Sequence, residues 1–118
     1  MSTLIIVFAS LLVTNVVDGD TFDYGGDRVR IANIDTPEIS RSQCPAEMVL
    51  GMAAKRRLES LLRRGKIDVI VGDPADGRTK DRYGRTLATV KVDGQDVGEI
   101  LIGEGLAKRW TGKRARWC

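Results

Sequence analysis

Two glycine turns near the start of the chain limit its fold more than any other feature of the sequence. Asp18-Gly19 is a dipeptide typical of a tight turn with positive φ, and Gly25-Gly26-Asp27 gives a second turn. The segments around them are rich in β-branched and apolar residues, which indicates strands at 11–17, 21–24 and 28–34. The sequence therefore predicts a three-stranded antiparallel meander.

A helix and two further strands are predicted after the meander. Apolar residues recur at helical spacing over 46–64, with Pro45 suited to the start of this helix and Gly65 to its end. The other predicted elements are a strand at 66–71, a long polar loop at 72–82, a strand at 85–92 and a short helix at 97–106. This order favours a mainly β (α+β) fold, the OB-fold. That fold is a five-stranded Greek-key barrel, here with one helix between strands three and four and a short helix after strand five.

The composition is consistent with one domain and excludes several kinds of chemistry. A chain of 118 residues is close to the commonest domain size. The formal net charge of +3 and the pI of about 9.1 favour an anionic partner. The sequence contains no histidine, which excludes Ser-His-Asp and Cys-His nucleophile pairs, histidine-ligated zinc and histidine-based cleavage of RNA.

The ends of the chain leave alternatives open. Residues 1–10 match the apolar part of a signal peptide in length but also suit an extended first strand, and they are too short to span a bilayer. Cys44 and Cys118 either form one disulfide in an exported protein or remain two free thiols. In the basic tail we expect Trp110 to pack on the core. The sequence leaves open whether Trp117 frays with the chain end or stacks on bases, as aromatic residues among cations can.

A dense cluster of charged residues interrupts the predicted strands. Its members are Asp18, Asp20, Asp35, Glu38, Arg28 and Arg30. Arg30 and Asp35 have opposite strand parity, so both can face one site only if the strand ends, bends or bulges between them. Thr36-Pro37 provides a natural end, because proline cannot donate to a strand ladder. The cluster indicates a carboxylate metal site opposite guanidinium groups, which is chemistry suited to a phosphodiester.

Three motifs in this chain resemble those of the staphylococcal nuclease family. They are DGDT at 18–21, R-x-x-x-x-D-T-P-E at 30–38 and D-R-Y-G-R at 81–85. The motifs occur in the family's order, with the expected elements between them, and the resemblance extends from about residue 11 to residue 108. It implies an OB-fold nuclease domain at 11–110, preceded by the apolar extension 1–10 and followed by the basic tail 111–118.

The resemblance also implies a role for individual residues. The catalytic residues would be Arg30 and Arg85, which hold the scissile phosphate, and Glu38, which orients or deprotonates the attacking water. The carboxylates of Asp20 and Asp35 and the backbone carbonyl of Thr36 would bind one Ca²⁺ ion, which prefers such oxygen ligands. Supporting or substrate-binding roles would fall to Asp18, Thr21, Arg82, Tyr83 and Trp110.

On this interpretation the chain is a Ca²⁺-dependent nuclease. It would hydrolyse DNA and RNA, prefer single strands, and cut the P–O5′ bond to leave 3′-phosphates. The alternative is a non-catalytic OB-fold module that binds nucleic acid or a protein. Base preference cannot be carried over from the family, because Arg109, Trp110, Thr111 and Lys113 replace the tyrosines that pack around the nucleotide in the family's best-known enzyme.

We expect a monomer with no stable membrane association. A secreted or periplasmic location is favoured over an intracellular one, because an unrestrained nuclease is hazardous in the cytoplasm.

Overall fold

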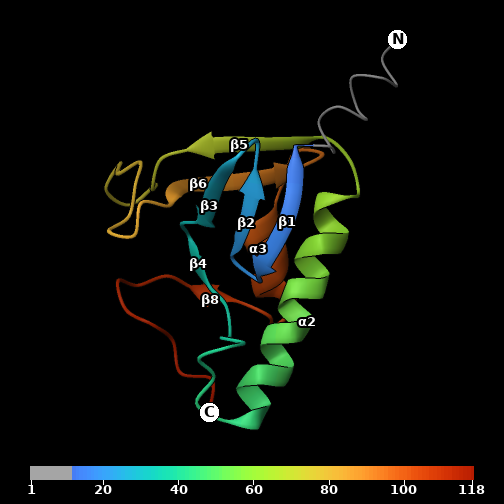
Figure 1. Cartoon of the computed structure of the whole chain (residues 1–118), viewed down its shortest axis with the longest axis vertical. Coiled ribbons are helices and arrows are strands. Elements are labelled where there is room, and N and C mark those ends of the chain that lie inside the picture. Colours follow the sequence, from blue (N-terminus) through green and yellow to red (C-terminus); the bar gives the residue numbers. More distant parts are fainter. Residues whose placement is uncertain (1–11) are drawn as a thin grey trace.

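The computed structural model describes residues 12–118 and contains the predicted meander (Figure 1). Its strands are β1 (Val13–Asp18), β2 (Thr21–Tyr24) and β3 (Asp27–Ile31), paired antiparallel in sequence order. Gly25 and Gly26 adopt φ values of 58° and 88°, which explains the glycines of the second turn. The predicted extension at 1–10 lies outside the described residues.

Strands β5 (Ile67–Val71) and β6 (Thr86–Val92) complete the main sheet, whose order is β1-β2-β3-β6-β5. Strand β6 runs parallel to β3 and antiparallel to β5. In Figure 1, β5 and β6 run roughly horizontally, whereas β1 and β2 run roughly vertically. The strand direction therefore turns strongly from one end of the sheet to the other. The predicted α+β fold of OB type is therefore confirmed, with the long helix between the third and fourth of these five strands.

Three very short strands were not predicted. They are β4 (Ile34–Asp35), β7 (Gln95–Asp96) and β8 (Lys108–Arg109). The third predicted strand, 28–34, is too long, because a turn at Ala32-Asn33 separates β3 from β4. Strand β4 then leaves the main sheet and pairs with β8. Of the three alternatives that the opposite parity of Arg30 and Asp35 allowed, the strand ends, and it does so before the Thr36-Pro37 position that the sequence suggested.

Within residues 12–118 the helices are α2 (Pro45–Leu62) and α3 (Val97–Gly103), both shorter at their C-terminal ends than predicted. Helix α2 begins at Pro45 as expected. Gly65 is not its left-handed stop, because the helix is already capped at Arg63 in a right-handed conformation. Gly65 instead admits the carboxylate of Asp93, which accepts a 2.9 Å hydrogen bond from the Lys66 amide.

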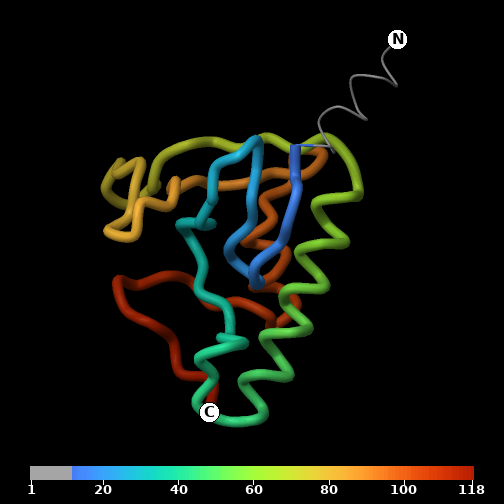
Figure 2. The backbone as a smooth tube through the Cα atoms, in the orientation of Figure 1, coloured from blue at the N-terminus to red at the C-terminus, as the bar shows by residue number. Residues whose placement is uncertain are grey.

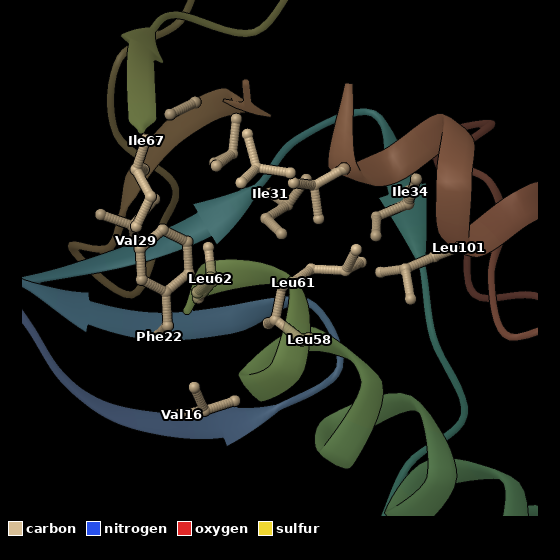
Figure 3. Packing of buried hydrophobic residues seen from close by; sticks show 14 of the residues in the cluster. Val16, Phe22, Val29, Ile31, Ile34, Leu58, Leu61, Leu62, Ile67 and Leu101 are labelled. Atoms are coloured by element: carbon tan, nitrogen blue, oxygen red, sulfur yellow. The ribbon is translucent and has the colours of Figure 1, made fainter. Parts of the chain in front are cut away.

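The core lies between helix α2 and the main sheet, and Leu101 of α3 also contributes to it (Figure 3). Leu58, Leu61 and Leu62 of α2 are buried, as are Phe22 and Val29 of the meander. Apolar burial of this kind is the main favourable term in folding. This packing holds the meander against helix α2. The turn between β1 and β2 and the end of β3 are thereby fixed in position. Among the described residues, no helix has both the length and the apolar character needed to cross a membrane.

Candidate active site

Two aspartates and an arginine converge where β2, β3 and β4 meet. Asp20 is buried, and its Oδ2 accepts a hydrogen bond from the amide of Thr36 at 3.2 Å while its Oδ1 accepts one from the Thr21 hydroxyl at 3.0 Å. Arg30 Nη2 lies 3.5 Å from Asp20 Oδ2 and 4.0 Å from Asp35 Oδ1. The structure thus brings residues of two sequence motifs together around one guanidinium group.

Arg30 is held by groups beyond these carboxylates. Its side chain is only 11% exposed, and Nη1 donates to the backbone carbonyls of Ile31 and Ile34 on either side of the turn between β3 and β4. Trp110 lies against it, with the guanidinium carbon 5.6 Å from the ring centroid. The expectation that Trp110 packs on the core is wrong, because this half-buried side chain faces Arg30 instead. Arg28 points elsewhere and pairs with Asp23 at 2.9 Å.

The carboxylates of this site repel one another. Burial raises the pKa of Asp18 to about 7, and the charge of Asp20 adds to the effect. Burial likewise raises the pKa values of Asp35 and Glu38. Burial opposes the ionisation of Asp20 too, but Arg30 and the hydrogen bonds to its carboxylate outweigh this, so its pKa is lowered. Arg30 and Arg114 thus face four carboxylates, those of Asp18, Asp20, Asp35 and Glu38, whose oxygen atoms suit a hard cation.

Within residues 12–118, no group of three or more His, Cys, Asp or Glu side chains is arranged to hold a metal ion. The side chains of Asp20 and Asp35 amount to two carboxylates, so a full coordination shell would need backbone, water or substrate oxygens as well. Ca²⁺ accepts such mixed oxygen sets.

The loop between β5 and β6 forms the facing wall of the site. Arg85 Nε donates to Asp81 Oδ2 at 2.7 Å, and Asp81 Oδ1 accepts from the amides of Tyr83 and Arg85. Tyr83 is 66% exposed, with the guanidinium carbons of Arg82 and Arg85 at 4.9 and 5.5 Å from its ring centroid. This loop and the Asp20 site line one cleft of about 650 Å³. Arg30 and Arg85 thus reach the same space from separate elements.

The tail is also part of the site. Cys44 and Cys118 form a disulfide, which answers the question that the sequence left open. The residues after Trp110, whose fraying the sequence left open, are attached to the domain. The amide of Ala115 donates to Asp35 Oδ2 at 2.8 Å, and Arg114 Nη1 lies 3.4 Å from Glu38 Oε1.

Sequence reasoning also missed Glu47. This buried carboxylate accepts hydrogen bonds from the amides of Glu38 at 2.9 Å and Gln43 at 2.8 Å. These bonds and the nearby Arg114 lower its pKa. An acidic residue in the first turn of a helix was the available signal for Glu47. Nothing in the local sequence distinguishes Arg114 from the other cations of the tail.

Gly19 connects the site to helix α2. Its φ is not positive, contrary to the expectation from the Asp18-Gly19 dipeptide. The reason for glycine is close packing, since a Cβ atom there would lie 2.6 Å from Ala54 Cβ and 3.0 Å from Thr36 Cβ. The turn that carries Asp20 therefore rests directly on the helix.

We predict that Gly19→Ala lowers the free energy of unfolding by about 1–3 kcal/mol, the usual cost of overpacking. Gly103→Ala is the matched control, because a Cβ atom at Gly103 meets no atom within 4 Å. The control should leave stability unchanged or raise it by up to about 1 kcal/mol. Urea unfolding of both variants measures the difference, and equal midpoints would contradict the packing argument.

The fold and the site together define a small OB-type domain with an acidic, arginine-lined cleft. Residues 28–116 match the family model described as "Staphylococcal nuclease homologue". The chain belongs to the staphylococcal nuclease family, so the resemblance seen in the three motifs is confirmed.

Three curated relatives illustrate this membership. The chain is 41% identical to the SPbeta prophage-derived endonuclease YokF of Bacillus subtilis over 78% of its own length and 31% of the relative. It is 36% identical to the endonuclease YncB of the same organism, covering 84% of this chain and 47% of the relative. It is 35% identical to the thermonuclease of Staphylococcus intermedius, covering 84% and 58%. The chain thus spans about a third to three fifths of the length of these relatives.

Proposed function

We propose that this chain is a Ca²⁺-dependent nuclease that hydrolyses DNA and RNA. It prefers single strands and cuts the P–O5′ bond, leaving 3′-phosphates. The observation that carries the proposal is the common cleft into which Asp20, Asp35, Glu38, Arg30 and Arg85 open. The names of the three relatives, two endonucleases and a thermonuclease, support the nuclease class.

The residues of the site fit a calcium ion. Asp20, Asp35 and the backbone carbonyl of Thr36 are the oxygen donors that would hold it, supported by Asp18 and Thr21 from the neighbouring turn. Bound there, Ca²⁺ would supply positive charge to a substrate phosphate. The excess of carboxylates over guanidinium groups around Asp20 supports a cation at this position.

The remaining chemistry belongs to side chains. Arg30 and Arg85 bind the scissile phosphate and stabilise the extra charge of its five-coordinate transition state, which forked donors do well. Glu38 orients or deprotonates the water whose oxygen attacks phosphorus. As that bond forms, the water gives up one proton to Glu38 or to solvent, the P–O5′ bond breaks, and O5′ takes up a proton from solvent to become a hydroxyl. Tyr83 and Arg82 of the β5–β6 loop, and Trp110, contact the substrate beside the reacting phosphate.

The direct test compares cleavage of denatured DNA and of RNA in millimolar Ca²⁺ and in EGTA. We expect cleavage with Ca²⁺ and none with EGTA. Asp35→Ala should lose both Ca²⁺ binding and activity while it remains folded by circular dichroism. Asp23→Ala is the control, because Asp23 pairs with Arg28 away from the cleft.

Two results would refute the proposal. One is a wild-type protein that binds single strands but cleaves them in neither condition, which would favour a non-catalytic OB-fold module. The other is a wild-type protein that neither binds Ca²⁺ nor cleaves, together with an Asp35→Ala protein that mainly loses stability, which would show that the charge cluster is only a salt-bridge network.

Export to a secreted or periplasmic location is part of the proposal. The Cys44–Cys118 disulfide supports it, because such bonds persist in oxidising compartments. Mass spectrometry of the protein from its native source, with a count of free thiols, tests both the mature N-terminus and the disulfide. We also propose that the protein acts as a monomer without stable membrane association, which size-exclusion chromatography and membrane fractionation test.

A further inference from the structure

The C-terminal strap, defined here as residues 111–118, runs from the end of β8 back to the start of α2 (Figure 2). Three attachments hold it in place. The disulfide fixes Cys118 to Cys44, Lys108 Nζ donates to the carbonyl of Arg116 at 2.6 Å, and the same ammonium group lies 4.4 Å from the ring centroid of Trp117. The strap is therefore held in a defined position against the rest of the domain.

The strap meets the site at two carboxylates. Ala115 donates its amide hydrogen to Asp35 Oδ2. Arg114 places Nη1 3.4 Å from Glu38 Oε1 and Nη2 3.3 Å from Glu47 Oε2, so one guanidinium group bridges two acids. In the described part of the chain, Arg114 is the one cationic residue with an ion pair to Glu38.

Glu47 and Arg114 constrain Glu38 at different points. Glu47 is buried and accepts a hydrogen bond from the backbone amide of Glu38, which fixes the chain there. Arg114 contacts the Glu38 carboxylate itself. A carboxylate on a flexible side chain loses rotamer freedom when it must adopt one orientation, and a fixed guanidinium group sets that orientation before substrate binds. Arg114 also stays 43% exposed beside the cleft, so the strap forms a wall of the cleft without filling it.

We propose that Arg114 is a positioning residue for Glu38, and that the Cys44–Cys118 disulfide positions Arg114. This inference rests on the proposed nuclease function and deepens it. It makes efficient turnover depend on a disulfide whose sulfur atoms take no part in the reaction. Arg114 acts through Glu38, so its loss should lower kcat, with a change in KM no larger than the loss of a neighbouring positive charge causes.

The test begins with steady-state cleavage of single-stranded DNA at saturating Ca²⁺ by Arg114→Ala and Arg114→Lys. We expect Arg114→Ala to lower kcat by about 10- to 100-fold, the usual effect of removing a group that orients a reacting side chain. The lysine variant should recover part of this loss, because an ammonium group reaches one carboxylate but cannot bridge two. Ca²⁺ affinity by calorimetry should stay unchanged in both. Both proteins should remain folded at the assay temperature, because Glu47 keeps the hydrogen bonds from the amides of Glu38 and Gln43.

Lys113→Ala is the charge control, because it removes one positive charge from the neighbouring residue. Its effect should appear in KM and not in kcat. The double variant Cys44→Ala/Cys118→Ala, assayed at a temperature where circular dichroism shows it folded, should reproduce the loss in kcat. Adding Arg114→Ala to it should cost nothing further, because the two changes remove one interaction.

Several outcomes would overturn the inference. An Arg114→Ala protein with unchanged kcat would show that Glu38 needs no such partner. A faster Arg114→Ala protein would show that the strap inhibits the site. Additive losses from the arginine and cysteine changes would separate Arg114 from the disulfide. A wild-type protein that cleaves nothing would refute the proposed function, and this inference with it, whereas the other three results leave that function intact.

Discussion

Arg85→Ala should lower kcat on single-stranded DNA by about 10²- to 10³-fold, the range observed when one donor to a transition-state oxyanion is removed. Arg85 lines the cleft opposite Arg30, on a loop that Asp81 holds in place. A guanidinium group that binds the phosphate more tightly in the transition state than in the bound substrate lowers the activation barrier of the chemical step. It therefore raises kcat, whereas equal binding of both states would lower only KM. The substitution also removes the ion pair between Arg85 and Asp81. Because the Arg85 side chain is 30% exposed, this should change the free energy of unfolding little.

Arg57→Ala is the matched control for this prediction. Arg57 makes a forked ion pair with Glu104, is 33% exposed and lies on helix α2, outside the cleft. Both variants lose an arginine from a similar ion pair, so their melting temperatures should be similar. Their kcat values should not, and an Arg85→Ala protein as active as Arg57→Ala would remove Arg85 from the mechanism.

Loss of the Cys44–Cys118 disulfide should lower the free energy of unfolding by about 4.5 kcal/mol, as expected from chain entropy for a loop of this size. The bond joins residues 74 positions apart. Most of the effect arises in the unfolded chain, which the disulfide prevents from expanding. Small domains have total stabilities of about 5–15 kcal/mol, so the reduced protein would unfold at far lower urea concentrations.

Urea unfolding with and without reductant measures this change. The Cys44→Ala/Cys118→Ala variant is the control, because reductant should shift its midpoint no further. If the oxidised and reduced proteins had equal midpoints, the disulfide would contribute nothing to stability. An effect of reductant on the control variant would instead identify an artefact of the reductant.

Much of the fold follows from local sequence. The glycines at 25 and 26, Pro45 at the start of α2 and the apolar spacing of that helix each act on their immediate neighbours. For that reason the positions of the five long strands and of α2 were predicted. The short strands β4 and β8 were not, because two-residue segments have no periodicity and form only where distant parts of the chain meet.

The sequence alone determined which residues are available for chemistry. The motifs around Asp20, Asp35 and Arg85 are short and contiguous, so they can be recognised without a structure. The absence of histidine restricts the chemistry that these residues can perform. The sequence also indicated that the third strand ends, bends or bulges between Arg30 and Asp35 if both face one site, since side chains alternate along a strand.

The tertiary structure decided how those residues are completed. Arg85 lines the same cleft as Arg30 only in the folded protein. Arg114 likewise meets Glu38 only there. The disulfide and the contacts of residues 114–117 make the basic tail a wall of the site. Such contacts join residues far apart in the chain, and their formation depends on the packing of the whole sheet and helix. The secondary-structure propensities of the individual segments therefore could not predict these contacts.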